Sequence, residues 1–122
     1  MIDLSKIQED LTSVIKLTNL QAKIFLLIVT EGKMTAKKIS NTLRISIDDA
    51  YSNGKQLIEL GSLIEISENE FEAMHPRFTA VNMYRKMCER EKVEFKRNVT
   101  VDNIGVLLER PYDDARTKYN KN

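Results

Sequence analysis

Hydrophobic side chains recur at three- and four-residue spacing in the first part of the chain, which predicts two amphipathic helices. The second helix begins at Thr18 and Gln21, a pair that can form a capping box, and ends at Gly32, which suits a left-handed cap. The apolar positions are Leu4, Ile7, Leu11, Val14 and Ile15 in the first helix and Leu20, Ile24, Leu27 and Ile28 in the second. These two stripes predict the base of a hydrophobic core.

Two shorter helices are predicted next, and each carries its own start signal. Thr35 caps a helix over residues 35–43, and Ser46 caps another over residues 47–60, which Gly61 ends. Residues 44–46 are the only separation between them. The apolar positions expected to complete a small core are Ile39, Leu43, Ile47, Tyr51, Leu57 and Ile58. The pattern therefore predicts two short helices joined by a tight turn.

Strand-like runs at residues 63–66 and 70–73 flank a polar turn and predict a β-hairpin. Helix, tight turn, helix and hairpin is the order of a winged helix-turn-helix, whose second helix usually enters the major groove of DNA. We therefore expect a mainly α fold with a small β-hairpin. Residues 1–75 are assigned to this winged helix-turn-helix domain.

Beyond the hairpin, Pro76 suits the first turn of a new helix. Apolar positions then continue over residues 77–109, as one long helix or as two helices broken near residues 98–102, where Thr100 could act as a cap. We favour one continuous helix, which would be about 50 Å long and would extend beyond the domain. Pro111 is expected to end the regular structure, which leaves residues 111–122 as a polar tail.

A helix of that length would expose an apolar face, which predicts pairing with a second copy of the chain. The expected interface residues are Val81, Tyr84, Cys88, Phe95, Val99, Ile104 and Leu108. Residues 76–110 are therefore assigned to a C-terminal dimerisation helix, and we expect a homodimer.

Length and composition describe one ordinary soluble domain, with 122 residues, 42% of them hydrophobic and 30% charged. No apolar run approaches a membrane span, and we expect no signal peptide. Cys88 is the single cysteine, which excludes an internal disulfide and a cysteine-rich zinc site. His75 is the single histidine, and packing accounts for both residues, so we expect no enzyme, metal or cofactor. A cytoplasmic location is the expectation.

The net charge of +1 is unevenly distributed. Residues 1–75 carry 8 Lys and Arg against 11 Asp and Glu, and residues 76–122 carry 11 against 7. Residues 33–55 nevertheless hold five cations and two acids, a local basic footprint that suits phosphate contacts. The hairpin carries four carboxylates (Glu65, Glu68, Glu70 and Glu72) and no cation, so we expect that it does not contact DNA.

Candidate DNA-binding residues follow from this order of elements. The first short helix and the turn usually contact phosphates, whereas polar side chains of the second helix can read base edges. The candidates are Thr35, Lys37, Lys38, Arg44, Ser46, Asp49, Ser52, Asn53, Lys55 and Gln56. Asp48 and Asp49 equally suit the N-terminus of a helix dipole. Gly54 is unusual inside a helix, and a close approach to DNA, a close approach to the hairpin, or a kink would each explain it.

From about residue 17 to residue 85 the chain resembles the DNA-binding domain of the archaeal TrmB-type transcriptional regulators. The shared features are Thr-Ala-Lys-Lys-Ile at residues 35–39, Tyr51, and Leu-x-x-x-Gly-x-Leu-Ile-Glu-Ile at residues 57–66. MarR-like and ArsR-like winged helices share part of this pattern. The resemblance implies sequence-specific DNA binding by a dimer whose interface is the long helix.

The chain departs from the TrmB-type pattern in two ways, and these limit which properties of the family are expected of it. Asp48 and Asp49 stand where the family tends to have a basic or polar residue. We also expect neither the sugar-binding effector domain of full-length members nor a small-molecule effector. The chain is therefore expected to be a homodimeric transcriptional regulator that binds double-stranded DNA through a recognition helix at about residues 47–60. The alternative is a winged-helix protein-interaction module of the transcription machinery that docks a basic partner on its acidic hairpin.

Overall fold

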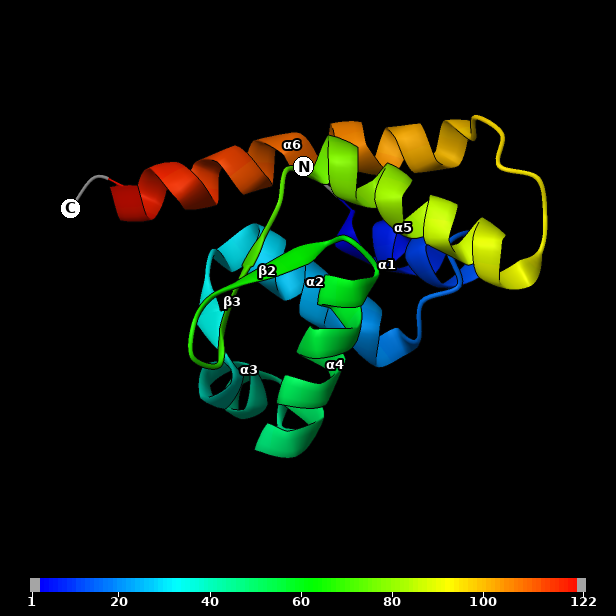
Figure 1. Cartoon of the computed structure of the whole chain (residues 1–122). Coiled ribbons are helices and arrows are strands. Elements are labelled where there is room, and N and C mark those ends of the chain that lie inside the picture. Colours follow the sequence, from blue (N-terminus) through cyan, green and yellow to red (C-terminus); the bar gives the residue numbers. More distant parts are fainter. Residues whose placement is uncertain (1–2, 121–122) are drawn as a thin grey trace.

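The computed structural model describes residues 3–120, with side chains described for residues 3–117. Its elements are α1 (Leu4–Ser13), α2 (Asn19–Glu31), β1 (Met34–Thr35), α3 (Ala36–Leu43), α4 (Ile47–Glu59), β2 (Leu63–Ser67), β3 (Glu70–Ala73), α5 (Pro76–Glu91) and α6 (Val99–Asn120). The fold is mainly helical, as expected. In Figure 1, α3 and α4 lie at one end of the molecule, whereas α5 and α6 lie at the other. Over residues 3–120, no helix has both the length and the apolar character needed to cross a membrane.

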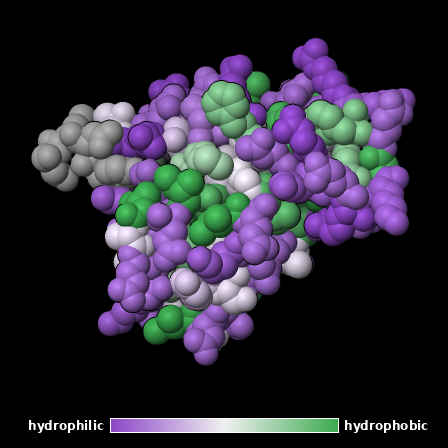
Figure 2. Space-filling view, in the orientation of Figure 1, coloured by the Kyte–Doolittle hydropathy of each residue, from purple (hydrophilic) through white to green (hydrophobic). Residues whose placement is uncertain are grey.

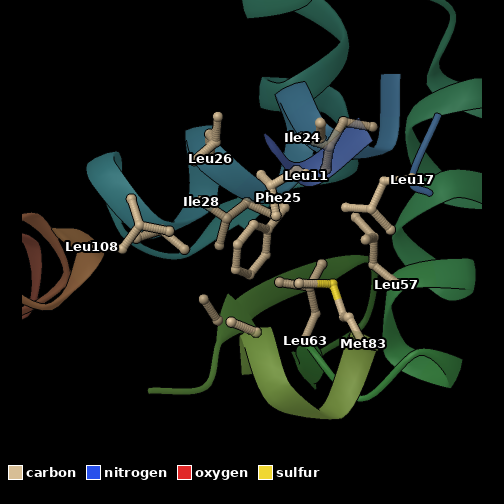
Figure 3. Packing of buried hydrophobic residues seen from close by; sticks show 14 of the residues in the cluster. Leu11, Leu17, Ile24, Phe25, Leu26, Ile28, Leu57, Leu63, Met83 and Leu108 are labelled. Carbon is tan, nitrogen blue, oxygen red and sulfur yellow. The ribbon is translucent and has the colours of Figure 1, made fainter. Parts of the chain in front are cut away.

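Helix α2 forms the centre of the core because four other elements pack around it: α1, α4, β3 and α6. Its residues Ile24, Phe25 and Ile28 are completely or almost completely buried. Figure 3 shows side chains from several helices meeting in one cluster, with Leu57 of α4 and Leu108 of α6 among them. The chain therefore builds one core in which both ends of the molecule participate.

The predicted capping box at the start of α2 is confirmed, and the helix ends at the predicted glycine. Thr18 and Gln21 form the capping box of α2, with both hydrogen bonds at 3.0 Å. Gly32 ends this helix as expected, but its φ of 96° and ψ of −170° are not those of the left-handed cap that was predicted. Such a φ costs glycine little because glycine has no Cβ. These caps act within a few residues, which is why sequence reasoning finds them.

The predicted hairpin is present, and it belongs to a three-stranded antiparallel sheet with the order β1-β3-β2. Strand β1 pairs Met34 with Phe71 and Thr35 with Glu70, a pairing that the sequence analysis did not predict. In addition, the N–H of Ala36 donates to the carbonyl of Asn69 at 2.8 Å. The hairpin turn is therefore held against the beginning of α3.

The prediction of one continuous helix over residues 77–109 is wrong. Helix α5 ends before Lys92, which adopts the left-handed conformation at φ 57°, and α6 begins only at Val99. The side chain of Asn98 accepts a hydrogen bond from the Val101 N–H at 3.2 Å, in place of the expected cap at Thr100. Because α6 folds back along α5, α2 and α1, much of the predicted apolar face is buried inside the chain.

The prediction that regular structure ends at Pro111 is also wrong, because α6 continues through it to Asn120. A proline inside a helix typically costs about 3 kcal/mol because it lacks an N–H and clashes with the preceding turn. Tyr112 and Ala115 are buried beyond this point, and Arg116 lies 3.9 Å from Glu72 of β3. Tertiary packing thus holds the last turns in place. Residues 121 and 122 of the predicted tail lie outside the described residues.

Candidate nucleic-acid interface

Helices α3 and α4 are joined by a turn whose geometry is set locally. Thr35 caps α3 by accepting from the Lys38 N–H at 3.1 Å, and Ser46 caps α4 by accepting from the Asp49 N–H at 3.0 Å. Between them, Arg44 takes a left-handed conformation with φ 58° and ψ 49°. The hydroxyl of Ser40 donates to the Ile45 carbonyl, which fixes the direction in which the chain leaves the turn.

The predicted phosphate-binding cations lie together on the exposed side of α3 and the turn. Lys37, Lys38 and Arg44 are all exposed. Among residues 3–117, none of the three forms an ion pair or a side-chain hydrogen bond. Their charges therefore remain available to an external anion.

The outer side of α4 is not covered by the C-terminal helices. α4 packs mainly against α2, α3 and β2, whereas α5 and α6 pack against each other at the opposite end of the molecule (Figure 1). Ser46, Asp49, Ser52, Lys55 and Gln56 are exposed, and Asn53 is half-buried. The side of α4 that was predicted to be polar therefore faces solvent.

Three of the predicted base-reading side chains already have partners inside the chain. Asn53 donates to the Asp49 carbonyl at 2.8 Å. Gln56 accepts from Gln21 of α2 at 2.8 Å, and Lys55 lies 3.2 Å from Glu65 of β2. Ser52 has no such partner among the described residues. These side chains must exchange partners before they can contact a base, which leaves Ser52 and the first turn of α4 the most accessible.

Ile47 is a surface residue that the sequence analysis placed incorrectly in the core. Ile39 and Leu57 are fully buried as expected, but Ile47 at the first position of α4 is 52% exposed. An apolar side chain at the start of a recognition helix can contact the methyl group of thymine. Helical periodicity alone could not detect this, because the first turn of α4 extends beyond the surface that α2 covers.

Gly54 allows the hairpin to pack against α4. A Cβ atom at this position would lie 2.6 Å from Cζ of Phe71, which is fully buried. The ring of Tyr51 lies 6.1 Å from that of Phe71 on the same side. Of the three explanations considered for Gly54, the structure supports close approach of the hairpin.

The carboxylates of the hairpin are largely engaged within the chain. Glu65 accepts from the Asn69 N–H at 2.9 Å and pairs with Lys55, and these two contacts lower its pKa in that order of importance. The hydrogen bond with Glu65 is the main cause that raises the pKa of Lys55. Glu70 accepts from the Ser67 hydroxyl, and Glu72 lies near Arg116. Only Glu68 has no such partner among the described residues.

The seven predicted dimer-interface residues are divided between the interior and the surface. Cys88, Ile104 and Leu108 are buried within the single chain, so they cannot form the interface that was expected of them. Val81 and Tyr84 are half-buried, and Phe95 and Val99 are exposed. The dimer was predicted because one long helix was expected to expose an apolar face. In the structure α6 packs against α5 within the same chain, so that reason no longer holds.

The single histidine and the single cysteine both occupy structural positions. The ring Nδ1 of His75 accepts from the Arg77 N–H at 3.2 Å and caps α5. Cys88 is buried in the same helix. Among the described residues, no three His, Cys, Asp or Glu side chains gather in a way that could hold a metal ion.

Comparisons of this chain with models of protein families, with curated proteins and with solved structures found no match.

Proposed function

We propose that this protein is a DNA-binding transcriptional regulator in which α4 enters the major groove and α3 and its turn contact the flanking phosphates. The observation that carries this proposal is the combination of an uncovered outer side of α4 with three exposed cations beside it, Lys37, Lys38 and Arg44. Phosphate neutralisation supplies much of the affinity of a DNA-binding protein, and such cations are its usual source.

The order of the elements supports a winged helix-turn-helix as the scaffold of this function. A three-residue turn joins α3 to α4, and the β2–β3 hairpin packs on α4 through Phe71. In such folds the second helix of the pair is the one that reads the bases. The resemblance to TrmB-type regulators points in the same direction.

The alternative function, docking of a basic protein on an acidic hairpin, has less support. Three of the four hairpin carboxylates, Glu65, Glu70 and Glu72, have partners within the chain. A basic partner would therefore compete with existing contacts, and among the residues that the structure describes only Glu68 of the hairpin would be available without such competition. DNA binding requires no comparable rearrangement at Lys37, Lys38 or Arg44.

The decisive experiment is a mobility-shift titration with random duplex DNA at two salt concentrations. We expect affinity that falls steeply with salt, with a slope that decreases by about 0.9 for each phosphate contact removed. The variant Lys37→Ala/Lys38→Ala/Arg44→Ala should lose most of this affinity. The control Lys86→Ala/Arg90→Ala/Lys92→Ala removes the same charge from α5 and the loop after it, and should bind nearly as the wild type. Absence of binding at low salt, or equal losses in the two variants, would refute the proposal.

The homodimer stays a prediction of the sequence, and DNA binding by α3 and α4 does not require it. If two copies bind together, their recognition helices should occupy half-sites about 10 base pairs apart or a multiple of that spacing. Light scattering at micromolar concentration measures the oligomeric state directly. If it shows only a monomer, the predicted homodimer is wrong and the expected half-site spacing no longer applies.

A further inference from the structure

At the end of the molecule opposite α3 and α4, the structure contains an open groove between α5 and α6. Its volume is about 490 Å³. The loop 92–98 forms one wall, and α5 and α6 form the others (Figure 1). Figure 2 shows hydrophobic side chains among hydrophilic ones over this part of the surface. A concave site of this size is in the usual range for small organic ligands.

The floor of the groove is apolar and partly aromatic. Its apolar lining residues are Val81, Tyr84, Phe95, Val101 and Val106. The rings of Tyr84 and Phe95 lie 5.9 Å apart in a tilted arrangement, and the guanidinium of Arg85 lies 4.9 Å from the centre of the Phe95 ring. Phe95 is thus held against α5, although it belongs to the connecting loop. The groove is preformed by these contacts.

The rim of the groove is basic. Arg77, Lys96 and Arg97 line it, with Asp102 as the one acid among the lining residues. Over residues 77–109 the chain carries seven Lys and Arg against five Asp and Glu, a difference of +2. Each of the three rim cations pairs with an acid at the surface: Arg77 with Glu109, Lys96 with Glu94 at 3.6 Å, and Arg97 with Asp102 at 2.8 Å. Such pairs contribute little to stability, so a ligand can replace the acid at small cost. Arg85 has no ion pair among the described residues.

The charge of this surface argues against a second copy of the chain as its occupant. A two-fold symmetric interface brings the same patch of both copies together, so two basic rims would face one another. Juxtaposed like charges disfavour that association. An apolar floor beneath a basic rim is instead complementary to an amphipathic anion.

We propose that the α5–α6 groove binds a small organic carboxylate with a flat apolar body, such as an aromatic acid. The body would lie against Tyr84 and Phe95, and the carboxylate would face Lys96 and Arg97 at the rim. This site is separate from α3 and α4 and does not depend on DNA binding. It goes beyond the sequence analysis, in which no small-molecule effector was evident.

The test is a titration of the full chain, followed by amide NMR, with three probes. These are 2-naphthoate, its neutral analogue 2-naphthalenemethanol, and acetate, which has the charged head without the body. We expect 2-naphthoate to bind at least about tenfold more tightly than the alcohol, as one charge-assisted contact allows, and acetate to show no saturable binding. Amide shifts should concentrate at residues 81–85 and 95–106.

Two variants with a matched control identify the contacts. Phe95→Ala should weaken 2-naphthoate binding by about tenfold or more, because it removes half of the aromatic floor. The control Phe78→Ala alters a side chain on α5 that is 69% exposed and does not line the groove, and should have no effect. Lys96→Gln/Arg97→Gln removes two rim cations and should abolish the preference for the acid over the alcohol.

Three outcomes would overturn the proposal. The first is equal binding of the acid and the alcohol by the wild type. The second is binding that Phe95→Ala leaves unchanged. The third is light scattering that shows a dimer which Phe95→Ala dissociates, together with no binding of 2-naphthoate, because the occupant would then be a second copy. Thermal unfolding of each variant confirms that it is folded.

Discussion

The α3–α4 pair and the α5–α6 pair each consist of two consecutive helices, but the connections between the helices are specified differently. The turn of α3–α4 is defined by neighbouring residues, namely the caps Thr35 and Ser46 and the left-handed Arg44. The α5–α6 pair is joined by the longer loop 92–98 and is defined by packing between segments distant in sequence. An apolar stripe that continues for many residues therefore does not imply a second chain, because the same chain can fold back to cover it.

The largest effect that tests this difference is expected in α6. Leu108 is completely buried and Leu107 is 48% exposed, although the two are neighbours in the same helix. Leu108→Ala should lower the free energy of unfolding by about 2–5 kcal/mol, whereas Leu107→Ala should change it by no more than about 0.5 kcal/mol. Urea denaturation measures both values. Similar small effects would mean that α6 does not pack on the core as described.

The next largest effect is expected for Gly54→Ala, which tests the contact between α4 and the hairpin. Helix propensity alone predicts a gain of about 1 kcal/mol for this change. Because the new Cβ would lie 2.6 Å from the Phe71 ring, we expect a loss of about 1–3 kcal/mol instead. The double variant Gly54→Ala/Phe71→Leu should recover part of that loss in the same denaturation experiment. A stabilised Gly54→Ala variant would contradict the packing.

Arg44 offers a smaller effect that separates stability from binding in the α3–α4 turn. Arg44→Gly and Arg44→Ala remove the same charge, so they should weaken DNA binding equally. The glycine variant should nevertheless be more stable than the alanine variant by about 1 kcal/mol, because the φ of 58° is costly for alanine. Denaturation and mobility-shift titration of the two variants provide the comparison. Equal stabilities would show that the left-handed turn is not maintained.

The smallest effect is expected at the exposed Lys55–Glu65 pair. The pKa of Glu65 is lowered in the folded chain, so its contribution to stability is present above its unfolded pKa and is lost as the pH falls through the folded value. The pKa of Lys55 is raised, so its contribution is lost only as the pH rises through the folded value at the alkaline end. Glu65→Gln should therefore reduce the difference in thermal midpoint between about pH 6 and about pH 3.

Glu68→Gln is the matched control for this change. Glu68 lies in the same hairpin and has no ion pair or side-chain hydrogen bond among the described residues. Its replacement should leave the acid dependence of the thermal midpoint unchanged. If the two variants behave alike, the hydrogen bond from Asn69 and the contact with Lys55 contribute nothing measurable.

Sequence reasoning succeeded where the deciding contacts span a few residues. The capping box of Thr18 and Gln21, the caps of α3 and α4, and the hairpin over β2 and β3 all belong to this class. The exposed cations of α3 were also found, because helical periodicity places them opposite the buried Ile39. Hydrogen bonds between near neighbours depend mainly on the local sequence, so local patterns reveal most of them.

Sequence reasoning failed where one segment meets another far along the chain. The pairing of β1 with β3, the exposure of Ile47 and the continuation of α6 through Pro111 each depend on such a meeting. The groove between α5 and α6 belongs to the same class, since its walls combine Tyr84 with the loop residue Phe95 and with Val106. No periodicity within one element specifies which distant surface will cover it.

The amino-acid sequence by itself determined the helices of the N-terminal half, the tight turn between α3 and α4, and the cations beside that turn. The tertiary structure alone decided that α6 folds back on α5 and α2, that the hairpin rests on Gly54, and that an open groove remains between the last two helices. The physical reason is that caps and turns depend on hydrogen bonds between residues close in sequence. Burial of an apolar stripe depends instead on which distant surface packs against it in the folded chain.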